Sequence, residues 1–222
     1  MTSFRIPLAA LFLLGALTAC GGEPETAGEP AMDEGAAPAE SPEGGALASA
    51  DAPSCQPMTE QMALEGRLSP YDSLRFQVGA AQALLCYGRP SSRGRTMIGG
   101  ENVPFGRLWR TGANEPTTLH LPFAAEVAGV AVEPGSYTIY TVPGETEWEV
   151  IINASTTQWG HEGRYTPEVE AQEVGRGAVP AEATDEHVET LTFRAEPADG
   201  GADLILEWEN SRVRIPVRAR GG

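Results

Sequence analysis

The chain has 222 residues, and its 15 Lys plus Arg against 31 Asp plus Glu give a formal net charge of −16. Because it has no basic surface to neutralise phosphates, a nucleic-acid partner is excluded. All the cations are Arg, so Schiff-base chemistry on Lys and a phosphate-loop lysine are excluded too. Beyond the N-terminus no apolar run approaches the roughly 18 residues of a spanning helix, which excludes a polytopic membrane protein.

Residues 1–20 have the pattern of an export signal. Arg5 precedes an apolar stretch over residues 6–17, and the sequence Leu-Thr-Ala-Cys ends the segment at Cys20. This ending resembles a bacterial lipobox, in which the cysteine is acylated and becomes the mature N-terminus. We expect Cys20 to carry a lipid anchor, with an ordinary cleaved signal or an uncleaved anchor as alternatives. Gly21 favours the outer membrane if the organism has one.

Residues 21–54 have the composition of a disordered tether. Twenty of these 34 residues are Ala, Gly or Pro, eight are acidic, and none is basic or aromatic. Such a segment cannot bury a core, and its negative charge holds the domain away from an anionic lipid surface. We expect one folded domain over residues 55–219, held at the bacterial cell envelope, on the periplasmic face or the surface, with the membrane as partner of the lipid anchor.

Two cysteines remain after lipidation, Cys55 and Cys86. In an oxidising compartment outside the cytoplasm we predict that they pair, which closes a loop of about 30 residues and contributes on the order of 3 kcal/mol. Two free thiols are the alternative. The wide spacing is no zinc signature, and we expect neither a metal nor another cofactor.

Apolar residues in the domain recur at every second position, which predicts strands. The clearest runs are residues 74–78, 147–152 and 190–193. Turn signals between the strands are Ala128-Gly129, Pro134-Gly135, Pro143-Gly144 and Gly200-Gly201. Only residues 58–66 and 165–174 favour short helices, and the second segment alternates in a way that also suits a strand. The predicted fold is all-β: a single antiparallel β-sandwich, jelly-roll-like, with one or two short helices.

The C-terminal residues predict a hairpin that reverses about Asn210-Ser211. The apolar residues on its inner face are Leu204, Leu206, Trp208, Val213, Ile215 and Val217. The expected charge pairs on the other face are Asp203–Arg218, Glu207–Arg214 and Glu209–Arg212. A four-residue loop over residues 209–212 is preferred, because it places Pro216 in a pair that needs no N–H donor.

The densest special region is residues 87–118, which is long, glycine-rich and polar. Five of the domain's 14 Arg fall within 22 residues of it. Loops of this kind commonly carry binding residues, and guanidinium groups suit carboxylate, phosphate or sulfate. The candidate ligand-binding residues are Arg95, Trp109, Arg110, Thr111, Asn114, Glu115 and Trp159, with either tryptophan as a stacking wall. The alternative is that Arg110 and Asn114 only satisfy backbone carbonyls of the loop.

Several segments are similar to signature segments of a bacterial family, the domain of unknown function 2911. They read GRTMIGGENVPFGRLWRTGANEPTTL, PGSYTIYTVPG, WEVIIN and QWG. The resemblance covers about residues 87–217, and WRTGAN, residues 109–114, is its most distinctive part. It implies an exported or lipid-anchored protein with a mainly β domain and no established activity. The recurring polar positions match Arg95, Arg110, Thr111, Asn114, Trp148, Asn153 and Trp159.

The sequence thus predicts a non-catalytic binding or interaction module for an anionic small molecule or glycan, or for an envelope protein. The first alternative is a hydrolase or isomerase that uses Glu115 or a histidine as general base. A concave pocket holding a desolvated carboxylate beside His120 or His161 would favour that alternative. A purely structural envelope protein is the other alternative.

Overall fold

The computed structural model describes residues 53–56 and 67–221. The elements are β1 (Tyr71–Val78), β2 (Ala81–Gly88), β3 (Thr117–Leu121), β4 (Ala125–Val127), β5 (Val130–Val132), β6 (Gly135–Val142), β7 (Glu147–Asn153), the 3-10 turn η1 (Glu162–Arg164), α1 (Pro167–Glu170), β8 (Glu173–Ala198) and β9 (Gly201–Ala219). The export signal with Cys20, residues 21–52 of the tether and the expected helix over residues 58–66 lie outside the described residues.

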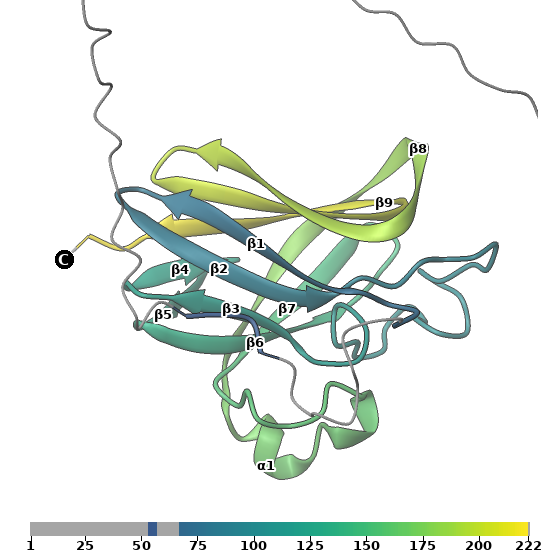
Figure 1. Cartoon of the computed structure of the whole chain (residues 1–222), viewed down its shortest axis with the longest axis horizontal. Coiled ribbons are helices and arrows are strands. Elements are labelled where there is room, and N and C mark those ends of the chain that lie inside the picture. The colour runs from purple at the N-terminus through teal and green to yellow at the C-terminus, as the bar shows by residue number, and fades with distance from the viewer. Residues whose placement is uncertain (1–52, 57–66, 222) are drawn as a thin grey trace, which may run out of the picture. The chain divides into compact units, whose positions relative to one another are not determined.

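Every strand pair is antiparallel, and the strands form one sheet in the order β1-β2-β3-β6-β7-β8-β9-β4-β5 (Figure 1). The all-β antiparallel prediction is therefore confirmed. The finer jelly-roll sandwich is not confirmed, because β8 joins the two halves of the sheet: its first residues pair with β7 and its last with β9. Register shifts after Ala183 and Val188 bend β8, so that one open sheet folds over its own core.

β9 doubles back near Asn210, as the sequence predicts (Figure 1). The two ends of β9 lie side by side, because the Ala219 N–H donates to the Gly200 carbonyl at 2.9 Å. The apolar residues of both arms are all buried in the core: Leu204, Leu206, Trp208, Val213, Ile215 and Val217. The predicted inner face of this hairpin is confirmed.

The polar face of the hairpin differs from its prediction. Asp203 pairs with Arg218 at 2.5 Å as expected, but Glu207 pairs with Arg212 and not with Arg214. Glu209 has a left-handed backbone (φ 54°), which makes the reversal tight. Strand geometry therefore continues through the bend, and the expected four-residue loop over residues 209–212 is wrong.

The turn signals lie between strands as predicted, and of the two helix signals the second, residues 165–174, can be compared with the structure. Ala128 and Gly129, for example, both have positive φ between β4 and β5. The ambiguous segment 165–174 contains both expected structures, since α1 occupies Pro167–Glu170 and β8 begins at Glu173. In the part of the chain that the structure describes, no helix has the length and apolar character to cross a membrane.

The two faces of the sheet have different roles. Leu119 of β3 and Tyr137 and Ile139 of β6 enter the core, whose other members come from nearly every strand. Because successive side chains of a strand point to opposite faces, His120 and Ser136 lie on the outer face. This outer face carries most of the polar groups described below.

Candidate functional site

The arginine-rich loop, residues 89–116, joins β2 to β3 without a regular helix. A bridge between Ser91 and Thr190 fastens its start to β8, and one between Trp109 and Thr141 fastens its end to β6. Gly88 lets the backbone of β2 lie close to the end of the loop, because a Cβ at residue 88 would lie 1.9 Å from the Ala113 carbonyl oxygen. The loop is therefore packed into the domain at both ends.

Trp109 is a core residue with only 4% of its surface exposed. Its ring stacks on Trp208 with 5.7 Å between centroids, and Trp148 meets it edge-on at 6.1 Å. Because these rings cover it, Trp109 does not present the ligand-stacking wall that the sequence suggested. Trp159 is half-buried and joins no ring pair among the described residues.

Arg110 and Thr111 make internal contacts. The Nε of Arg110 lies 3.7 Å from a carboxylate oxygen of Glu162, which also accepts the backbone N–H of Arg110 at 3.3 Å. Thr111 is fully buried, and its hydroxyl lies 3.1 Å from that of Thr141. These contacts are of the kind expected if the motif stabilises the loop.

Arg95 lies apart from Arg110. Its Nε and Nη2 donate to the Ser92 and Ser91 carbonyls at 2.9 and 3.2 Å. It lines a hollow of about 400 Å³ that also contains Glu209. The Glu209 carboxylate is already bound to two backbone N–H groups of the loop. Arg95, Arg110 and Asn114 thus do not converge on one site.

Asn114 and Glu115 end the loop. The Asn114 backbone is left-handed (φ 64°), and its side-chain amide donates to the Ser69 carbonyl at 3.4 Å. Glu115 is 1% exposed, and both its carboxylate oxygens accept from Nη1 of Arg67, at 2.9 and 2.8 Å. The carboxylate is therefore the buried counter-ion of Arg67.

Cys55 and Cys86 lie at disulfide-bonding geometry, with 5.5 Å between their Cα atoms, which supports the predicted pair. Cys86 sits opposite Thr118 on the neighbouring strand. The bridge thus holds residues 53–56 against the outer face of the sheet. The Pro53 carbonyl accepts a hydrogen bond from Nη2 of Arg75 at 3.0 Å.

A polar pocket of about 170 Å³ lies on this outer face, and Tyr71, Glu115, His120 and Ser136 line it. His120 Nδ1 lies 2.7 Å from Ser136 Oγ. Burial, and next the positive charge of Arg75, lower the pKa of His120. Burial, with a smaller contribution from the Glu115 carboxylate, raises the pKa of Tyr71 to about 12. A desolvated carboxylate thus lines one pocket with a histidine.

The other two histidines have local contacts. Nδ1 of His161 accepts the Gly163 N–H at 3.0 Å and caps η1, and exposed His187 lies 3.4 Å from Glu189. Within residues 53–56 and 67–221, no three His, Cys, Asp or Glu side chains are grouped as metal ligands.

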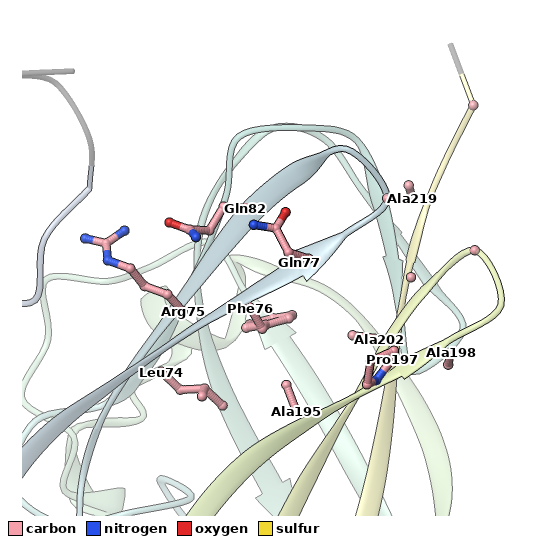
Figure 2. Close-up of a pocket in the computed structure, with 14 residues that line it drawn as sticks. Leu74, Arg75, Phe76, Gln77, Gln82, Ala195, Pro197, Ala198, Ala202 and Ala219 are labelled. Carbon is pink, nitrogen blue, oxygen red and sulfur yellow. The ribbon is translucent and has the colours of Figure 1, made fainter. Parts of the chain in front are cut away.

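A larger hollow, about 770 Å³, lies between β1 and the β8–β9 hairpin. Figure 2 shows Leu74 and Phe76 of β1 on the side of Ala195 and Ala202, whereas Arg75 extends from the opposite side of the strand. Among the described residues that line the hollow, Arg75 is the one that carries a charge. Among the described strands, β1 pairs with β2 alone and the end of β8 with β9 alone, and the Phe193 N–H of β8 donates to the Tyr87 hydroxyl at 3.1 Å.

The sequence candidates did not include Arg75, His120 or Ser136 as ligand-binding residues. Arg75 and His120 stand between apolar neighbours, which fixes the face of the strand that each occupies, and Ser136 lies in the signature segment PGSYTIYTVPG. Strand register then decides that His120 and Ser136 are opposite each other. That pairing cannot be read from either strand alone.

Residues 69–217 match the family model described as protein of unknown function (DUF2911). No curated protein and no solved structure gives a match to the chain. The matched region begins just before β1 and ends within β9, so it contains the arginine-rich loop and the strands that line both pockets. On this match the chain belongs to the DUF2911 family, as its WRTGAN and neighbouring segments indicated.

Proposed function

We propose that this protein is a binding module tethered at the bacterial cell envelope, whose ligand is an anionic small molecule with an apolar body. The lipobox-like Cys20 and the acidic segment 21–54 support the tether and the membrane as its partner. The ligand site is the hollow between β1 and the β8–β9 hairpin. This site replaces the arginine-rich loop as the candidate.

The lining of the hollow carries the proposal. Its volume of about 770 Å³ is within the range of small-molecule sites, roughly 300–1,000 Å³. Leu74 and Phe76 supply an apolar wall, and Arg75, which extends from the opposite side of β1, is the one charge among the described lining residues. An apolar chain that lies against this wall, with a carboxylate, phosphate or sulfate head that reaches Arg75 over the edge of β1, matches that arrangement.

The same lining favours an apolar anion over a glycan. Sugar recognition by ring stacking needs an accessible aromatic face, and Phe76, the one aromatic residue that lines the hollow, is 5% exposed. The hollow also lacks a nucleophilic or general-base side chain in its described lining. Binding without chemistry is therefore the activity that this site supports.

Thermal unfolding of the purified protein with decanoate or decyl phosphate tests the proposal. At 100 times the dissociation constant, binding adds about 2.7 kcal/mol, or about 5–10 °C in midpoint. Arg75→Gln should weaken binding of both anions and leave decanol unaffected, and Ala195→Leu should fill the hollow and weaken all three. Arg107→Gln, in the exposed part of the loop, is the matched control. No shift with any probe would favour the purely structural envelope protein.

A further inference from the structure

We propose that Ser136 and His120 form a nucleophile–base pair that hydrolyses esters of short acyl groups in the polar pocket. This activity is separate from binding in the apolar hollow. It is a specific form of the hydrolase that the sequence offered as an alternative, in which His120 and not Glu115 is the general base.

Strand register places the two side chains together. His120 of β3 and Ser136 of β6 are direct partners in the sheet, both on the outer face. Ser136 Oγ lies 2.7 Å from His120 Nδ1, within the range for a nucleophile and its base. Ser136 is exposed, so a substrate can reach the hydroxyl.

The surroundings keep His120 able to accept a proton. Burial and the charge of Arg75 lower its pKa, so the ring is neutral at pH 7. In the tautomer with hydrogen on Nε2, Nδ1 accepts the Ser136 hydroxyl proton. Glu115, which faces the same pocket, does not compete as a base because Arg67 binds both its carboxylate oxygens.

Tyr71 supplies a donor for the developing oxyanion. Its side chain lines the pocket, and its phenol makes no hydrogen bond to any described residue. A pKa raised to about 12 keeps the phenol protonated throughout the working range of a histidine base. A preorganised neutral donor of this kind stabilises negative charge that forms on a carbonyl oxygen.

The reaction needs only water as co-reactant. Ser136 Oγ bonds to the ester carbonyl carbon while its proton moves to His120 Nδ1, and the oxyanion is bound by the Tyr71 hydroxyl. The C–O bond to the alcohol breaks, and the alcohol leaves with the proton from His120. A water molecule then attacks the carbonyl carbon of the acyl-serine and gives a proton to His120. The bond to Ser136 Oγ breaks, the acid is released, and His120 returns the proton to Ser136 Oγ.

Pocket size limits the acyl group. A volume of about 170 Å³ equals roughly six waters at about 30 Å³ each. This volume suits a short acyl group such as acetyl or propionyl. The substrate class is thus distinct from the long-chain anions proposed for the apolar hollow.

The test is a fluorophosphonate probe on the full chain, followed by peptide mass spectrometry, with p-nitrophenyl acetate hydrolysis measured in parallel. We expect the label on Ser136 and at least about a 100-fold loss of hydrolysis in Ser136→Ala and His120→Gln. Tyr71→Phe should lower kcat by about 10-fold or more and still take the label.

Ser91→Ala is the matched control, because the Ser91 hydroxyl has a partner at the same 2.7 Å, the Thr190 hydroxyl, but no base. It should keep full labelling and hydrolysis. Absence of label at Ser136, or hydrolysis that persists in Ser136→Ala with an unchanged circular dichroism spectrum, overturns the proposal. Neither result bears on ligand binding near Arg75.

Discussion

Replacing Glu115 by Gln should destabilise the domain strongly. Arg67 and Glu115 are 4% and 1% exposed in their side chains, and two hydrogen bonds of 2.8–2.9 Å join them. Gln keeps the shape of Glu but removes the charge, so the guanidinium is left buried beside a neutral amide. Breaking one side of a buried pair typically costs about 3–5 kcal/mol, which for a domain of this size lowers the melting temperature by about 6–20 °C.

Urea unfolding, followed by tryptophan fluorescence, measures this loss directly. The double variant Arg67→Met with Glu115→Leu supplies the matched comparison, because it removes both charges and keeps apolar volume. We expect the double variant to be more stable than Glu115→Gln, since it removes both members of the buried pair and not one alone. A loss below about 1 kcal/mol in Glu115→Gln would refute the reasoning, because it would mean that water screens the pair as it does at a surface.

Three further predictions concern the disulfide, the tryptophan cluster and His120. Cys55→Ser should lower the free energy of unfolding by about 3 kcal/mol, since the bridge spans 31 residues, and the oxidised wild type should show neither Cys55 nor Cys86 as a free thiol in non-reducing mass spectrometry. Trp109→Ala should cost about 3–5 kcal/mol and reduce the near-ultraviolet circular dichroism, because it opens the core beneath Trp208. His120 should titrate in the native state below 6.5 by nuclear magnetic resonance. The unfolded state then binds the proton more tightly than the native state does. The contribution of His120 to the free energy of unfolding is therefore present above pH 6.5 and is lost as the pH falls through the native pKa. His120→Gln should remove this pH dependence of the free energy of unfolding.

Strand alternation predicted the faces of the sheet well. The runs around Phe76, Trp148 and Phe193 all place their apolar residues in the core. Period two fixes which face a residue occupies but says nothing about which strand lies beside it. The continuity of β8 from its pairing with β7 to its pairing with β9, which depends on its register shifts, therefore could not be read from the sequence.

The arginine-rich loop illustrates a different limit. Composition drew attention to Arg95 and Arg110, because guanidinium groups bind anions. An irregular loop, however, also leaves backbone carbonyls that need donors: Arg95 donates to two of them, whereas Arg110 lies 3.7 Å from the Glu162 carboxylate and its buried Nε makes no hydrogen bond to a described residue. Composition cannot separate these two uses, since both require the same residue type in the same kind of segment.

The WRTGAN segment ends one residue before Glu115, which lines the polar pocket. Trp109 anchors one end of the segment in the core against Trp208, and Gly112 and Gly88 bring the backbones of the loop and β2 together. Glu115 follows the segment directly, pairs with Arg67 and lines the pocket. The distinctive motif thus leads into one wall of a pocket that His120 of β3 and Ser136 of β6 also line, and Ser136 lies in the signature segment PGSYTIYTVPG.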